Sequence, residues 1–181
     1  MTRPLWAPWR VEYIRGEKEE GCFLCRMFAE STDRENLILF RGTTVAVLMN
    51  RYPYNSGHLM VAPFRHIAGL EDRTTEEILE METLTARAVA VLRDVMAPQG
   101  FNIGINLGAA AGAGLEDHLH QHIVPRWVGD TNFMPVMSDT RVVPETLLDT
   151  YDLLLEKFNP KADATQMTKL ETPKDPRNLE A

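Results

Sequence analysis

The chain has 181 residues, about the length of one domain, and its 44% hydrophobic and 25% charged residues are ordinary for a globular protein. No apolar run approaches the roughly 18 residues that a membrane-spanning helix needs, so we expect neither a membrane protein nor a membrane partner. The formal net charge of -7 argues against an electrostatic grip on bulk nucleic acid. These features predict a cytoplasmic protein and leave its function open.

Residues 1–21 are predicted to form an extended N-terminal arm, because Pro4 and Pro8 interrupt any long helix there. Three strands are predicted after the arm, from runs of apolar and β-branched residues bounded by turn residues. They cover residues 36–40, 45–49 and 58–64. The first two strands should form a hairpin, and a loop dense in turn residues should lead into the third.

The longest helix is predicted to begin after Thr74, which can form a capping box with Glu77. Apolar residues then recur at helical spacing on one face, at Ile78, Met81, Leu84, Ala88, Val91 and Val95. Pro98 and Gly100 end this helix. A second amphipathic helix is predicted over residues 144–158, and the polar residues 159–181 beyond it are expected to form a poorly ordered tail.

A fourth strand is predicted over residues 101–107, where apolar residues on one face alternate with small polar residues on the other. The Gly- and Ala-rich residues 108–114 predict a flexible or tightly turned loop. With a fifth strand after that loop, the elements predict an α+β fold. It consists of a mostly antiparallel sheet of about five strands, one long helix packed on the sheet and a C-terminal helix. The domain should span residues 22–158.

Three histidines lie close together at His118, His120 and His122, directly after the Gly-rich loop. Alternate residues of a strand share one face at a spacing of about 6.6–6.8 Å, so the three imidazoles are expected to form a ladder on one face. Imidazoles that lie side by side cannot all carry a charge, and at least one should stay neutral near pH 7. A neutral imidazole suits either a metal ligand or a nucleophile.

Two chemistries therefore remain open for the histidine ladder. A catalytic zinc or iron usually has a carboxylate among its ligands, but Asp117 would point to the opposite face. Alternatively, one imidazole attacks a phosphorus atom while a neighbour donates a proton to a phosphate oxygen. The backbone N–H groups of residues 108–114, among them those of Gly112 and Gly114, would then hold the anion.

The histidine segment resembles the signature of the histidine triad (HIT) family, His-x-His-x-His-x-x, which ends a strand after a glycine-containing loop. Asn50, the pair Gly57-His58, and Asn106 also match positions where this family places nucleotide-site residues. The resemblance covers residues 6–135, and its flanking segments are similar to a bacterial branch that includes diadenosine tetraphosphate phosphorylases. It implies that Asn50 contacts the ribose and that Asn106 contacts the α-phosphate.

The resemblance also implies a role for each histidine near the site. His120 would be the nucleophile that forms a nucleotidyl-histidine at the α-phosphate, and His122 would bind the phosphate and the departing oxygen. His118 would orient the nucleophile or serve structurally, and His58 would complete the cluster by hydrogen bonding. Gln121 occupies a position that is usually apolar in the family, and we expect it to be a solvated or interface residue.

Cys22 and Cys25 have the Cys-x2-Cys spacing of a zinc half-site, although the same spacing also fits two buried thiols or a redox pair. Family members with such a pair place a histidine where this chain has His66. The resemblance therefore implies a closed structural zinc site made of Cys22, Cys25, His66 and His118. No catalytic metal is expected, because the histidine mechanism needs none.

The leading hypothesis is an enzyme that cleaves dinucleoside polyphosphates of the diadenosine tetraphosphate type through a covalent nucleotidyl-histidine. Inorganic phosphate or water would resolve this intermediate. An adenosine phosphoramidase or aminoacyl-adenylate hydrolase would use the same residues. A non-catalytic nucleotide-binding module and a metal-dependent oxygenase are alternatives from other classes. The family further implies a homodimer in which the long helix and a central strand of each subunit pair.

Overall fold

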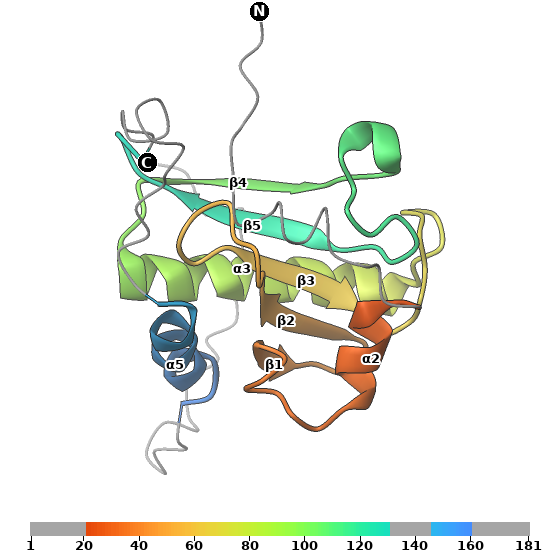
Figure 1. The fold of residues 1–181 in the computed structure, drawn as a ribbon, viewed down its shortest axis with the longest axis horizontal. Coiled ribbons are helices and arrows are strands. Elements are labelled where there is room, and N and C mark those ends of the chain that lie inside the picture. The colour runs from red at the N-terminus through yellow and green to blue at the C-terminus, as the bar shows by residue number, and fades with distance from the viewer. Residues whose placement is uncertain (1–20, 131–145, 161–181) are drawn as a thin grey trace, which may run out of the picture.

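The computed structural model describes residues 21–130 and 146–160. The predicted arm, apart from Gly21, and the tail beyond residue 160 lie outside these residues. One five-stranded antiparallel sheet forms the centre of the described part (Figure 1). The strands are β1 (Ile38–Arg41), β2 (Val45–Met49), β3 (Leu59–Pro63), β4 (Gly100–Ile105) and β5 (Gln121–Arg126), in the spatial order β1-β2-β3-β5-β4. The helical segments are α2 (Phe23–Ala29), α3 (Thr75–Met96), the 3-10 helix η1 (Ala109–Ala111) and α5 (Leu147–Phe158). The predicted α+β fold is confirmed.

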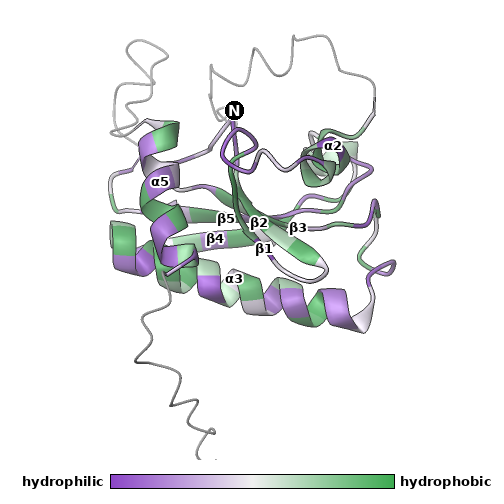
Figure 2. Cartoon of the chain, turned by 90° about the horizontal axis from the view of Figure 1, so that it is seen from below, coloured by the Kyte–Doolittle hydropathy of each residue, from purple (hydrophilic) through white to green (hydrophobic). Residues whose placement is uncertain are grey.

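Helices cover both faces of the sheet, with α3 along one face and α2 on the other (Figure 2). The larger core lies under α3 and α5 and takes Val47, Val61 and Ile123 from three strands. The smaller core packs Leu24 of α2 against residues of the opposite face, such as Met60. The strands β2 and β3 are buried on both faces, which explains why their sequences are continuous apolar runs.

The long helix α3 begins as the sequence predicts. The N–H of Glu77 donates to the Thr74 side chain, and the N–H of Thr74 donates to the Glu77 carboxylate. Met81, on the predicted apolar face, is fully buried. The prediction that Ile78 belongs to this face is wrong, because its side chain is 40% exposed. At this end of the helix the inward position is taken instead by Glu77, whose carboxylate lies 2.7 Å from the guanidinium of Arg65.

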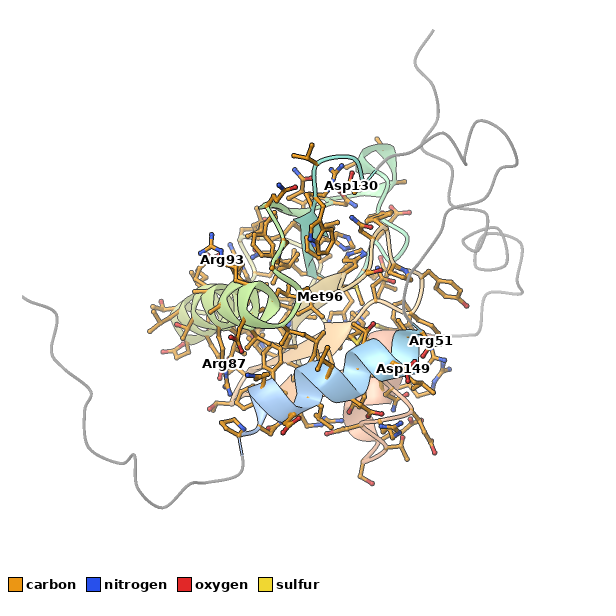
Figure 3. The ribbon with its side chains drawn as sticks, turned by 90° about the vertical axis from the view of Figure 1, so that its left-hand side faces the viewer. Arg51, Arg87, Arg93, Met96, Asp130 and Asp149 are labelled. Carbon is orange, nitrogen blue, oxygen red and sulfur yellow. The ribbon has the colours of Figure 1, made fainter. Side chains whose placement is uncertain are left out.

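The C-terminal end of α5 packs against α3. Figure 3 looks along α3, with α5 beside it and Arg87 where the two helices meet. The Arg87 guanidinium lies 4.3 Å from the centre of the Phe40 ring and donates to the carbonyl of Phe158. The predicted helix over residues 144–158 is described from Leu147 onward. None of the helices in the described residues is long and apolar enough to cross a bilayer.

Among the described strands, β4 lies at one edge of the sheet. Its central residues are exposed, including the apolar Ile103 at 47%. The predicted strand over residues 101–107 ends at Ile105, and Leu107, expected on its apolar face, is also exposed. The helix α3 packs mainly on β2, β3 and β5, and Phe101 and Ile105 are the residues of β4 that pack against the core under it.

Candidate functional site

The three clustered histidines lie where the chain enters β5. This strand begins one residue after His120, so only His122 lies in the sheet and the predicted ladder on one strand is wrong for His118 and His120. The backbone departs from the sheet here because the N–H of Leu119 donates to the carbonyl of Ile67 at 2.6 Å instead of to a strand. The predicted alternation is nevertheless seen, with Leu119 buried in the core under α3.

The histidine rings divide into two groups. The imidazole cluster consists of His58, His120 and His122. The Cys–His cluster consists of Cys22, Cys25, His66 and His118. The two are linked by a hydrogen bond of 2.8 Å from Nδ1 of His120 to the main-chain carbonyl of His118.

The turn before β3 positions His58 in the imidazole cluster. Gly57 has a φ of +73°, a conformation in which any L side chain would be strained, so this turn favours glycine. The His58 ring is fully buried and stacks on Tyr54 with ring centres 4.8 Å apart. Its ring centre lies 5.1 Å from that of His122.

Hydrogen bonds determine the proton positions of His58 and His122. The N–H of Tyr54 donates to His58 Nδ1 at 3.1 Å, so the proton of the neutral His58 ring is on Nε2. His58 Nε2 then donates to His122 Nδ1 at 3.0 Å, which places the proton of a neutral His122 on its own Nε2. His122 is therefore a hydrogen-bond donor at Nε2.

His120 has the opposite arrangement. Its Nδ1 donates to the carbonyl of His118, so its Nε2 keeps a lone pair. Burial lowers the pKa of His120, which keeps the ring neutral near pH 7. The rings of His120 and His122 lie edge to face with centres 4.9 Å apart. A buried ring with a lone pair at Nε2 thus lies beside a ring that is a donor at Nε2, and a nucleophile and an oxygen-binding partner require these two properties.

The Cys–His cluster brings together all four residues that the sequence assigned to a metal site. Cys22 is the N-cap of α2 and Cys25 lies in its first turn, so both sulfurs lie at one helix end. Nδ1 of His118 lies 3.2 Å from Cys22 Sγ and 3.5 Å from Cys25 Sγ, and Nδ1 of His66 lies 3.3 Å from Cys25 Sγ. The four ligand atoms lie within 4.8 Å of one another.

A tetrahedral zinc ion fits this donor set. Zinc–sulfur bonds of about 2.3 Å and zinc–nitrogen bonds of about 2.0–2.1 Å imply sulfur–nitrogen separations of about 3.6 Å. The observed separations of 3.2–3.5 Å are close to this value. Nε2 of His118 donates to the carbonyl of Pro63 at 2.8 Å, so Nδ1 presents its lone pair toward the sulfurs. Burial and the neighbouring Cys22 raise the pKa of Cys25, and a bound cation would offset this penalty on the thiolates.

The two asparagines assigned to the nucleotide lie at strand ends. Asn50 follows β2, and its side-chain oxygen accepts a hydrogen bond from the N–H of Tyr52 at 2.8 Å. Asn106 follows β4, in which Gly104 pairs with His122. The register of β4 with β5 ends at the pair of Ile105 with Gln121, so Asn106 and His120 are the residues that directly adjoin this last pair along the chain.

The Gly-rich loop takes the tightly turned form, which is one of the two forms predicted for it, because it contains η1. Gly112 ends this short helix with a φ of +85°, and its N–H donates to the carbonyl of Ala109 at 2.9 Å. The N–H of Ala109 in turn donates to the Glu116 carboxylate at 3.1 Å. Gly114 follows two residues after Gly112. Phosphate binding through the Gly112 N–H would therefore require its internal hydrogen bond to open.

The sequence prediction was also wrong for Gln121, and it missed two other features. Gln121, expected to be a solvated or interface residue, is 6% exposed and donates to the Thr85 hydroxyl under α3. Tyr54, which stacks on His58, was missed because its loop was analysed only for turn residues. The helix α2 was also missed, although the Cys-x2-Cys spacing itself could have indicated a helical turn.

Comparisons with known proteins agree with this geometry. Residues 31–128 match the family model of the HIT domain. The chain is 41% identical to the AP-4-A phosphorylase of Mycobacterium tuberculosis over 85% of this chain and 83% of that protein. It is 32% identical to the asymmetrical bis(5'-nucleosyl)-tetraphosphatase of Schizosaccharomyces pombe over 51% of this chain and 50% of that protein. The crystal structure of a Zn-bound histidine triad family protein from Mycobacterium smegmatis superposes with a TM-score of 0.61 at 25% identity, covering 76% of this chain and 93% of that one. The chain therefore belongs to the HIT family.

Proposed function

We propose that this protein cleaves dinucleoside polyphosphates by nucleotidyl transfer to His120, within a catalytic domain that spans residues 22–158. One observation carries the proposal: the buried His120 ring, whose Nε2 keeps a lone pair, lies edge to face with the His122 ring, whose Nε2 is a hydrogen-bond donor. A nucleophile needs the lone pair, and the phosphate oxygens need the donor. We also assign Asn50 to the ribose and Asn106 to the α-phosphate, with Gly112 and Gly114 in the adjoining loop.

In the first step, His120 Nε2 attacks the α-phosphorus of the substrate. A phosphorus–nitrogen bond forms, and the bond to the departing nucleoside polyphosphate breaks with its electron pair on the departing oxygen. The His118 carbonyl stabilises the positive charge that develops on the His120 ring, because it accepts the Nδ1–H. His122 donates from Nε2 to a phosphate oxygen. Phosphate or water then attacks the same phosphorus, breaks the phosphorus–nitrogen bond and restores His120.

The substrate class is supported by the relatives. One with 41% identity is an AP-4-A phosphorylase, and another with 32% identity is a bis(5'-nucleosyl)-tetraphosphatase. A polyanionic substrate on a chain of net charge -7 needs local donors, and the imidazole cluster and the main-chain N–H groups of the adjoining loop are the groups we assign to this task. Adenine nucleotides and inorganic phosphate are therefore the proposed reactants.

The test is product analysis after incubation with diadenosine tetraphosphate, with and without phosphate. Phosphorolysis would give ADP plus ATP, whereas hydrolysis would give AMP plus ATP. A rapid quench under alkaline denaturing conditions, which preserve a phosphorus–nitrogen bond, followed by mass spectrometry, should find an adenylyl group on the peptide that contains His120. Faster turnover of an adenosine 5'-phosphoramidate in parallel would favour the phosphoramidase alternative. Tight nucleotide binding without any product would contradict the enzymatic proposal.

We propose that the Cys–His cluster holds a structural zinc ion. The four donors would close the coordination sphere, so the ion would have no open position for chemistry. Its role would be to hold His118, whose carbonyl accepts the Nδ1–H of His120. Two cysteines that serve as metal ligands remain thiolates in a reducing compartment, which supports a cytoplasmic location for the enzyme.

We also propose a homodimer formed through the edge of β4 and the exposed side of α3. Ile103 on β4 is 47% exposed and Leu79 on α3 is 69% exposed. An apolar edge strand is a ready surface for pairing with another chain. Light scattering should give twice the monomer mass, and Ile103→Arg should halve it. Leu153→Arg, at an apolar α5 position that is 42% exposed, is the matched control and should leave the dimer intact. A monomeric wild-type protein would contradict this proposal.

A further inference from the structure

Gln121 is a polar side chain in an apolar core, one residue after the proposed nucleophile. It is 6% exposed, and Leu119 and Ile123 on the same face belong to the large core under α3. Its Nε2 donates to the hydroxyl oxygen of Thr85 at 2.9 Å. Thr85 lies on the buried side of α3 and is 5% exposed. Burying two polar groups does not improve on an apolar pair of the same shape, so packing alone does not account for this contact.

The pair ties β5 to α3 at the point where the main chain leaves the sheet. Gln121 is the first residue of β5 and is paired with Val61 of β3 and Ile105 of β4. His120 precedes the strand and has no partner in its register. On the other side of His120, the N–H of Leu119 donates to a loop carbonyl. The main chain is thus fixed on both sides of His120, by the hydrogen bond of Leu119 before it and by the strand pairing of Gln121 after it.

A hydrogen bond contributes something here that apolar contact does not. The hydrophobic effect is non-directional, so it opposes separation of α3 and β5 more than a small slide between them. A buried hydrogen bond of 2.9 Å defines both a distance and a direction. In-line attack on phosphorus depends on an exact distance and direction between the reacting atoms, because a misplacement of about 1 Å can lower a rate about 100-fold. The same hydrogen bond also fixes the position of His122, which directly follows Gln121 in the strand.

We propose that Gln121 and Thr85 are positioning residues for nucleotidyl transfer. Their hydrogen bond holds the start of β5 against α3, and with it His120 and His122. This inference rests on the proposed function of His120. Both side chains lie on the α3 side of the sheet, opposite the imidazole cluster, so they act through the backbone and not on the substrate. Their loss should therefore lower kcat and leave KM largely unchanged.

The test uses steady-state kinetics with diadenosine tetraphosphate and phosphate. Thr85→Val and Gln121→Leu each break the hydrogen bond and leave one buried polar group unpaired, so both should lower the melting temperature. Both should also lower kcat about tenfold or more. Thr85→Ser keeps the hydroxyl and should retain kcat within about twofold. Single variants with wild-type kcat, or a loss confined to KM, would overturn the proposal.

The double variant Thr85→Val/Gln121→Leu separates positioning from packing. It leaves no unpaired polar group, so its melting temperature should return toward the wild-type value. Its kcat should remain low, because the directional tie is still missing. Recovery of kcat together with stability would overturn the proposal. If a single variant fails to fold, the double variant carries the comparison on its own.

Thr150→Val is the matched control, since Thr150 is a buried threonine of α5 whose hydroxyl donates to a helix carbonyl at 3.1 Å. It should lower the melting temperature without changing kcat. Two different results would contradict the two proposals. Failure of the wild-type protein to form adenylyl-His120 would contradict the proposed function. An active wild-type protein whose kcat does not change when Thr85 or Gln121 is replaced would contradict the positioning role alone.

Discussion

The imidazole cluster and the Cys–His cluster lie next to each other and use the same side chain in opposite ways. His118 donates its Nε2 proton to the carbonyl of Pro63 and turns Nδ1 toward the cysteines. His120, two residues later, donates its Nδ1 proton to the carbonyl of His118 and keeps Nε2 unprotonated. The hydrogen-bond partner of one ring nitrogen thus determines which atom remains for a ligand or for a nucleophile. Residue type alone does not separate the two roles.

His120→Asn should have the largest effect, because it removes the proposed nucleophile from the imidazole cluster. We expect kcat to fall by about 1,000-fold or more, since the covalent step has no substitute group. Nucleotide affinity, measured by calorimetry with a non-reactive analogue, should change by less than about threefold. Adenylylated protein detected in this variant would contradict the assignment.

His58→Phe tests whether the proton arrangement inside the imidazole cluster matters. Phenylalanine keeps a ring against Tyr54 but cannot donate to His122 Nδ1. His122 is then free to lose its Nε2 proton, and kcat should fall about 100-fold. Zinc content should be unchanged. Equal kcat for wild type and variant would show that the His58–His122 hydrogen bond has no part in the reaction.

Cys22→Ser should act on the other cluster first and on the reaction second. Elemental analysis of wild-type protein purified without added metal should find about one zinc ion per chain, and the variant should have lost most of it. We expect a lower melting temperature and a fall in kcat of about tenfold, because His118 then loses its fixed position. Wild-type protein with fewer than about 0.2 zinc ions per chain would refute the metal assignment.

Glu77→Gln should have the smallest effect on activity and a clear effect on stability. The hydrogen bonds from Arg65, which precedes His66, hold the pKa of Glu77 below its ordinary value of 4.5, and a hydrogen bond from Thr74 adds to this. A lowered folded-state pKa contributes stability above about pH 4.5 that is lost as the pH falls further. Urea unfolding should show a loss of about 1–2 kcal/mol at pH 7 for the variant, and a shallower decline toward pH 3 than in wild type. A pH dependence identical to that of wild type would contradict this account.

Much of the fold follows from local sequence patterns. The capping box at Thr74 and the apolar run of β2 were predicted at the positions where the structure has them. The strand over residues 36–40 was placed too early because Leu37 adopts a φ of +58°, which propensity does not predict for leucine, and β1 begins at Ile38. The exposed Ile78 shows a further limit, since helical spacing indicates an apolar face but not where that face leaves the core.

The candidate histidines and cysteines could be named from the amino-acid sequence without a structure. Histidines at alternate positions and a Cys-x2-Cys pair are chemically uncommon enough to be recognised without a structure. Tertiary structure decided which residues work together: Cys22 meets His118 across 96 residues, and Gln121 meets Thr85 across 36. It also decided the proton positions, because the carbonyl of Pro63 and the N–H of Tyr54 select one ring nitrogen each. Such choices depend on distances of about 3 Å between groups brought together only by folding, and no local pattern encodes them.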